Sequence, residues 1–123
     1  MLCNDLYQLL SLAGSDGNYE ARVRLLRESA VYAAHFPGMP VTPGACLVEM
    51  AAELASVAAG TSLDVCGAPD IRFLQVILPD GTDELVFRLE GTVPEETPAL
   101  WAVHVYEGET LCARMKLQFH KIA

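Results

Sequence analysis

The sequence has few basic residues and no apolar run long enough to cross a membrane. It contains 8 lysines and arginines against 16 acids, which gives a formal net charge of −8 at pH 7. The field of such a protein repels phosphate backbones, which argues against nucleic-acid binding. A membrane-spanning helix needs roughly 20 apolar residues. The most apolar stretch, Ala45 to Ala59, is interrupted by Glu49 and Glu53.

From the first ten residues we expect no secretory leader, and the sequence has no cysteine pair with metal-site spacing. The first ten residues carry an acid where a signal peptide has basic residues, and no small-residue cleavage site follows, so we expect a cytoplasmic protein. The four cysteines form no Cys-x-x-Cys motif; they are Cys3, Cys46, Cys66 and Cys112. This spacing predicts free, reduced thiols and no metal centre.

Apolar residues are plentiful. They make up 52% of the 123 residues, and the mean hydropathy is +0.28. This length predicts a single domain over 1–123 with one hydrophobic core. So high an apolar content in a short chain indicates surface that is buried only when the chain associates with itself.

The first half of the sequence predicts two helices and one strand. The leucines at 2, 6, 9 and 10 have helical spacing, which predicts a short helix over 1–13. Alternation from Tyr19 predicts a half-buried strand. The stretch 35–43 holds three prolines and a glycine, which predicts a loop. A second helix then begins, with Thr42 as its cap and Pro43 in its first turn, and ends at Gly60. Because it is apolar on almost every side, we expect other structure to surround it.

The second half predicts four strands. They cover 70–78, 84–92, 99–106 and 110–120, with turns at 79–81, 95–96 and 108. One buried helix wrapped by a curved antiparallel sheet is an α+β architecture. A sheet of this kind leaves an edge and an apolar face uncovered, so we expect a dimer.

The stretch from His35 to Glu49 holds the residues with chemical potential. His35 titrates near neutrality and lies in a proline-rich loop that fixes its position. Gly44 lies at the start of the second helix, where backbone N–H groups lack intrahelical partners and favour negative charge. Glu49 follows about 7–8 Å further along the helix axis. A base, an acid and an oxyanion site together suit β-elimination next to a thioester carbonyl.

The sequence His-Phe-Pro-Gly-Met-Pro-Val-Thr-Pro-Gly, residues 35–44, resembles the signature loop of the 3-hydroxyacyl-[acyl-carrier-protein] dehydratases. That family has the pattern His-Phe-Pro-Gly-x-Pro-Val-x-Pro-Gly and a catalytic Glu fourteen residues after the His, as Glu49 follows His35 here. The resemblance implies the hotdog fold, with His35 as base at the α-carbon and Glu49 serving the β-hydroxyl. It implies that the Gly44 N–H binds the carbonyl. We expect three more residues to line the substrate site, namely Phe36, Val41 and Pro43.

The resemblance also implies the reaction and the partners. The substrate is a 3-hydroxyacyl group on acyl carrier protein, or on coenzyme A, and the product is a trans-2-enoyl thioester in fatty-acid or related acyl-chain biosynthesis. No cofactor is expected. The His of one subunit works with the Glu of the other, so we expect a homodimer with composite active sites, which can assemble further. A sister group that also isomerises the double bond has Asp where this chain has Glu49, so we expect dehydration alone.

The resemblance is weaker outside this region. Residues 72–81 align with the family pattern Arg-Phe-x-x-Pro-Val-x-Pro-Gly-Asp, but Val76 replaces a proline and the final pair is inverted. The family's N-terminal motif Pro-His-Arg-Tyr-Pro-Phe is missing. Two other functions stay open: an acyl thioesterase on the same fold, and a non-catalytic acyl-binding subunit.

We expect no catalytic role for several other residues that carry polar groups. We expect Glu53 to be structural, His104 and His120 to be solvated, and Trp101 to belong to the core. Four basic residues would form a patch for an acidic carrier protein if their strands were neighbours; they are Arg22, Arg24, Arg114 and Lys116. The alternative is that they are ordinary solvated positions on strand faces.

Overall fold

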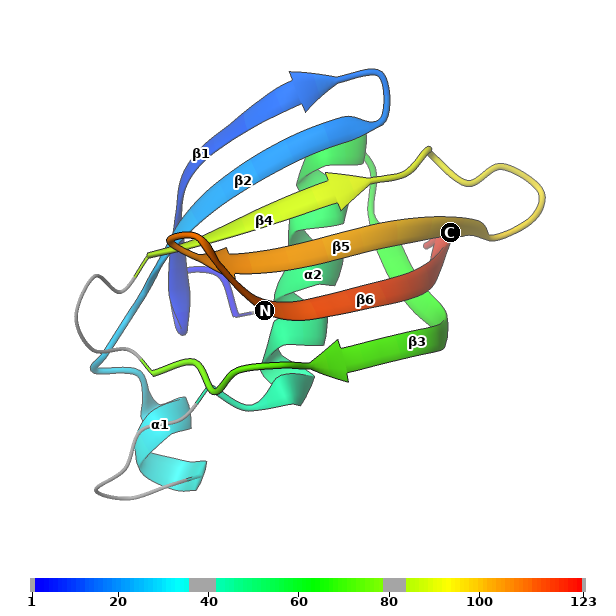
Figure 1. Ribbon diagram of the computed structural model, residues 1–123. Coiled ribbons are helices and arrows are strands. Elements are labelled where there is room, and N and C mark those ends of the chain that lie inside the picture. The colour runs from blue at the N-terminus through cyan, green and yellow to red at the C-terminus, as the bar shows by residue number, and fades with distance from the viewer. Residues whose placement is uncertain (1, 36–41, 79–83, 123) are drawn as a thin grey trace.

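A six-stranded antiparallel sheet wraps one long helix (Figure 1). The computed structural model describes residues 2–35, 42–78 and 84–122, and for 33–35 the backbone alone. The helices are α1 (Ala30–His35) and α2 (Gly44–Ala59). The strands are β1 (Tyr7–Ser15), β2 (Asn18–Leu25), β3 (Leu63–Phe73), β4 (Glu84–Glu90), β5 (Ala99–Glu107) and β6 (Thr110–Lys121). Their order in the sheet is β1-β2-β4-β5-β6-β3. The predicted α+β class is confirmed.

Alternation along the strands explains why the sheet packs on α2. Ala21, Phe87, Val105 and Ala113 are register partners on β2, β4, β5 and β6, and all four are fully buried. Side chains of a strand alternate between the two faces of the sheet, so their polar neighbours point outward. Burying a large apolar side chain stabilises the fold by roughly 1.5–3 kcal/mol. These rows therefore fix which face of the sheet meets the helix.

Helix α2 begins at a proline instead of a capping hydroxyl. Pro43 is the N-cap, and no side chain caps the helix. The predicted Thr42 cap is wrong because the Thr42 hydroxyl bonds the Tyr32 hydroxyl instead, at 3.0 Å. The predicted end is correct: Gly60 has φ 73°, and its N–H donates to the carbonyls of Ser56 and Val57. A left-handed residue at this position is most often glycine because it has no Cβ.

The predicted N-terminal helix is wrong, since residues 7–15 form the edge strand β1. The reason is the turn that follows. Asp16 and Gly17 both have positive φ, 54° and 84°, and an Asp-Gly pair in this conformation closes a two-residue hairpin. Pairing with β2 then joins Leu12 to Ala21 across the hairpin. The leucine spacing fits a helix, but the Asp-Gly turn determines the structure.

Strand β3 begins earlier than the sequence pattern predicts. The pattern places it at 70–78, whereas it covers Leu63–Phe73 and pairs with β6. Register shifts on both sides of Gly67 break the alternation, and Pro69 suits an edge strand. The predicted turn at 79–81 lies outside the described residues. The other three strands lie within two residues of their predicted bounds.

One face of α2 is not covered by its own chain. The buried helix residues are Leu47, Met50, Ala51, Leu54 and Ala55. Ala45, Glu49 and Val57 are exposed, and a cleft of about 450 Å³ lies between β1, this helix face and β3. The sheet wraps the helix as predicted, and this face is the apolar surface that we expect a single sheet to leave uncovered. No helix among the described residues is long and apolar enough to cross a membrane.

We predict that Gly91→Ala destabilises the protein by more than about 2 kcal/mol, because overpacking a rigid core is costly. A Cβ at Gly91 would lie 2.2 Å from the Trp101 ring. That ring is buried and its Nε1–H donates to the Thr92 carbonyl at 2.8 Å, so it has little freedom to move. Urea unfolding followed by circular dichroism measures the loss.

The matched control is Gly67→Ala, whose Cβ would meet the end of the flexible Gln118 side chain. Its expected cost is below about 1 kcal/mol. Equal losses in the two variants would contradict the prediction.

Candidate active site

The structure describes only part of the predicted site. Pro43, Gly44 and Glu49 are described; Phe36 and Val41 lie outside the described residues. His35, predicted in a loop, is instead the last residue of α1, and only its backbone is described. Pro43 immediately precedes α2, whose first residue is Gly44. Apart from the His35 backbone, the described part of the predicted site therefore begins where the chain enters α2.

Close packing against Phe73 favours glycine at position 44. A Cβ there would lie 2.6 Å from the Phe73 ring. The two residues line a cavity of about 270 Å³ together with Thr42, Leu47, Leu74, Gln75 and Val76. In the described part of the chain, the Gly44 N–H has no hydrogen-bond acceptor. A helix N-terminus with such a donor suits an oxygen that gains negative charge.

Glu49 lies in a different hollow from Gly44. It lines the cleft between β1, α2 and β3, whose wall is mostly apolar, with Val48 and Ala52 as its helix neighbours. Its charge acts on Cys46: burial first, and then the negative charge of Glu49, raise the pKa of that thiol. Cys46 is consequently a poor nucleophile near neutral pH. The four cysteines are free, as the sequence predicts.

Glu53 holds the N-terminal segment against α2. Its carboxylate accepts hydrogen bonds from the N–H of Leu2 at 2.7 Å, the N–H of Cys3 at 2.9 Å and the Tyr7 hydroxyl at 2.9 Å. Burial, and then the neighbouring Glu53, raise the pKa of Tyr7 far above its usual value, so the phenol remains a donor. The structural interpretation of Glu53 is confirmed. Its partners were not foreseeable because the N-terminal segment reads as a helix.

The predicted basic patch does not form. Arg22 and Arg24 lie on β2 and Arg114 and Lys116 on β6, and β4 and β5 separate these strands. Both β2 arginines pair with Glu84, at 3.6 and 3.4 Å. These residues are therefore ordinary positions on a solvated sheet face, the alternative interpretation.

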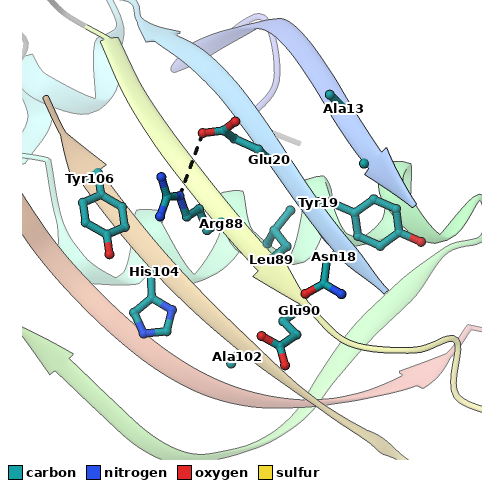
Figure 2. A pocket seen from close by; sticks show the side chains of 11 residues that line it. Ala13, Asn18, Tyr19, Glu20, Arg88, Leu89, Glu90, Ala102, His104 and Tyr106 are labelled. Carbon is teal, nitrogen blue, oxygen red and sulfur yellow. Dashed lines mark ion pairs between the residues drawn. The ribbon is translucent and has the colours of Figure 1, made fainter. Parts of the chain in front are cut away.

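The sheet face away from α2 carries a shallow groove, which is lined by residues of β2, β4 and β5 and by the end of β1 (Figure 2). Arg88 pairs with Glu20 at 3.9 Å and lies over the Tyr106 ring, 5.1 Å from its centre. His104 lines the same groove and is half-buried. His120 is exposed and pairs with Asp64 at 3.7 Å. Trp101 is fully buried, which confirms its place in the core.

Comparison with known proteins identifies the family. The sequence model described as ApeI-like, ApeI dehydratase, matches residues 12–115, so the chain belongs to the ApeI-like dehydratase family. The 3-hydroxyacyl-[acyl-carrier-protein] dehydratase FabZ of Desulforamulus reducens is 31% identical over 98 residues. That match covers 72% of this chain and 66% of the relative, so this chain spans slightly less than two thirds of the relative's length. The resemblance noted from the signature loop is confirmed.

Solved structures confirm the hotdog fold. The dehydratase heterocomplex ApeI:P from Xenorhabdus doucetiae superimposes with a TM-score of 0.68 at 11% identity, over 93% of this chain and 97% of that one. A hypothetical thioesterase with coenzyme A from Streptococcus pneumoniae gives 0.65 at 11% identity, over 95% and 89%. At these identities the likeness concerns the fold alone.

We predict that Gly44→Ala costs about 1 kcal/mol of stability, because the new Cβ displaces the Phe73 ring. The ring is half exposed and can swing outward. In Gly44→Ala/Phe73→Ala the clash is gone, so the double variant loses less than the two single variants together. Urea unfolding of the four proteins in the cycle measures this coupling. Additivity within about 0.3 kcal/mol would show that Phe73 is not the obstacle.

Proposed function

We propose that the chain dehydrates a 3-hydroxyacyl thioester to the trans-2-enoyl thioester in fatty-acid or related acyl-chain biosynthesis. The observation that carries the proposal is the place of Glu49. It is an exposed carboxyl group in a mostly apolar cleft, fourteen residues after His35, in a chain of the ApeI-like dehydratase family. A carboxyl group beside apolar walls suits proton transfer to a group on an acyl chain.

The reaction is an elimination of water. His35 removes the proton from the α-carbon, and the electron pair forms the new double bond between the α- and β-carbons. Negative charge builds on the thioester oxygen, which the Gly44 N–H at the start of α2 stabilises. The bond to the β-hydroxyl breaks as Glu49 donates a proton to it, and water leaves. His35 returns its proton and Glu49 regains one through solvent, so the enzyme is unchanged. Phe36, Val41 and Pro43 complete the proposed substrate site.

The geometry of α2 supports a site built from two chains. Residues five positions apart on an α-helix project about 140° apart, at 3.6 residues per turn. Gly44 and Glu49 have this spacing, and they line separate hollows. One substrate molecule can meet both groups if a second chain supplies one of them. This favours the composite site, with His35 and Gly44 from one subunit and Glu49 from its partner.

A dimer would also account for the surface that a single chain leaves uncovered. Val57 on α2 and Ile122 after β6 are 54% and 55% exposed, and both line the cleft that contains Glu49. Strand β3 next to this cleft is an edge strand with unpaired backbone groups on one side. A homodimer would pair with this edge and close the open side of the cleft, which would then enclose the acyl chain. Assembly beyond the dimer, the single domain over 1–123 and the cytoplasmic location stay predictions.

Acyl carrier protein is the proposed carrier, with coenzyme A as the alternative, because both present a pantetheine arm. The relative FabZ acts on the carrier-bound substrate by its name, and the structural neighbour contains coenzyme A. The basic residues of β2 and β6 do not form one patch, so they give no argument for docking of an acidic carrier protein. Comparing kcat/KM for the two thioesters would identify the carrier.

We predict that purified protein removes one water from a 3-hydroxyacyl-pantetheine thioester, as detected by mass spectrometry. His35→Ala and Glu49→Gln should each lower kcat at least about a hundredfold, because each removes a proton-transfer group. The matched controls are His104→Ala and Glu90→Gln on the opposite sheet face, which should retain activity. Free thiol without dehydration would identify a thioesterase. Binding of the thioester without turnover would identify a non-catalytic acyl-binding subunit.

We further predict that mixing the two inactive variants restores activity. In a dimer of one His35→Ala chain and one Glu49→Gln chain, one composite site carries both substitutions and the other carries neither. Random exchange of subunits should thus recover about a quarter of wild-type activity, since about half the dimers are mixed and each has one intact site. Co-expression with two affinity tags provides the mixed dimer. Sites contained within one chain would give no recovery.

A further inference from the structure

Glu53 lines the same cleft as Glu49, one helical turn further along α2. Residues four apart on a helix lie on the same face, about 6 Å apart along the axis. The two carboxylates differ in their partners. In the described part of the chain, Glu49 accepts no side-chain or backbone hydrogen bond, whereas Glu53 accepts three. The oxygens of Glu53 are therefore occupied by hydrogen bonds within the protein, whereas those of Glu49 are available to a ligand.

The three hydrogen bonds fix one wall of the cleft. All the donors belong to residues 2–7, and Cys3 and Tyr7 of this segment line the cleft opposite β3. Hydrogen bonds to an ionised acceptor are roughly twice as strong as neutral ones. The segment is anchored from its other side by Leu6, which is fully buried and whose carbonyl accepts from the Leu26 N–H at 2.7 Å. Residues 2–7 are therefore held from both sides. Glu53 is the residue that ties this wall of the cleft to α2.

The facing wall is mostly apolar, although Ser62 and Asp64 also contribute to it. Val65 on β3 and Ile122 after β6 line it, and Val57 lies on the helix beyond Glu53. An acyl chain is attracted to such a surface because contact removes apolar area from water. An acyl chain that runs from Glu49 along α2 toward Val57 would pass the segment that Glu53 holds. The width available to the chain depends on where residues 2–7 lie.

Resting on the proposed function, we propose that Glu53 is a specificity-determining positioning residue: by tying residues 2–7 to α2, it limits the length and bulk of the acyl chain that the cleft accepts. It acts through the segment and transfers no proton. Releasing the tie lets the segment move outward, and longer chains then fit. Short chains, which do not reach the segment, should react as before.

The variants separate this role from a purely structural one. Glu53→Gln keeps the shape of the side chain but replaces one acceptor oxygen with an NH2 group, so at least one donor loses its partner. Tyr7→Phe removes a single hydrogen bond and keeps the ring, and it carries the test if Glu53→Gln fails to fold. Glu90→Gln makes the same change of charge on the opposite sheet face. Circular dichroism establishes folding for each variant.

The readout is kcat/KM over a series of 3-hydroxyacyl-pantetheine thioesters of increasing chain length. We expect the ratio of long-chain to short-chain kcat/KM to rise about tenfold in Glu53→Gln, the scale that contacts of one or two methylene groups supply. Tyr7→Phe should give a smaller rise, and Glu90→Gln none. The short-chain value should stay within about threefold of wild type. An equal loss at every length, or no change at any length, would overturn the inference.

A binding series makes the inference independent of the proposed reaction. Unreactive thioethers of pantetheine with the same acyl lengths are titrated into wild type and Glu53→Gln by calorimetry. If wild type dehydrates nothing, the proposed function fails, but a shift of affinity toward longer chains in Glu53→Gln would still support the tie. An unchanged affinity profile would overturn it.

Discussion

Helix α2 must bury more than one face, and its own chain covers only one. The inward rows of β2, β4, β5 and β6 take up the face that carries Met50 and Leu54. The sheet curls round the helix but its edges, β1 and β3, do not meet, so Glu49 and Val57 stay exposed between them. A helix this apolar is rarely left half covered. The cleft, the two separate hollows and the case for a second subunit all derive from this incomplete cover.

Different interactions determine the structure around the two residues of α2 on either side of Glu49, namely Gly44 and Glu53. At the start of α2, steric exclusion dominates, because the missing Cβ of Gly44 makes room for the Phe73 ring. In the third turn, electrostatics dominate, because the Glu53 carboxylate collects two backbone N–H groups and a phenol. Glu49 lies between them with no such partner. Because Glu49 accepts no hydrogen bond within the described part of the chain, its oxygens are available to the substrate of the proposed reaction.

The sequence predicted those parts of the fold that depend on local pattern. Alternation located β2, β4, β5 and β6, and Gly60 marked the end of α2, because each signal is contained in a few neighbouring residues. The errors arose where residues outside a segment determine its structure. Residues 7–15 become a strand through the Asp16–Gly17 turn and pairing with β2. Thr42 does not cap α2 because Tyr32 binds its hydroxyl.

The candidate site was predictable to a similar extent. The signature loop and the spacing to Glu49 pointed to the family, which the comparisons confirm. The spacing could not show that Gly44 and Glu49 line different hollows, since that requires the direction of each residue on the helix and the position of Phe73. Nor could it show which donors Glu53 binds. The basic residues on β2 and β6 appeared close only while the strand order was unknown.

The strand order also constrains how the chain folds. Strands β1 and β2 are adjacent in sequence and their turn is short, so this hairpin can form from local contacts within microseconds. The next pairing joins β2 to β4, and the whole of α2 and β3 lies between them in the chain. Closing so long a loop is slow. During synthesis α2 therefore leaves the ribosome before β4, β5 and β6, three of the four strands that cover it, and its apolar side chains are open to self-association until those strands follow.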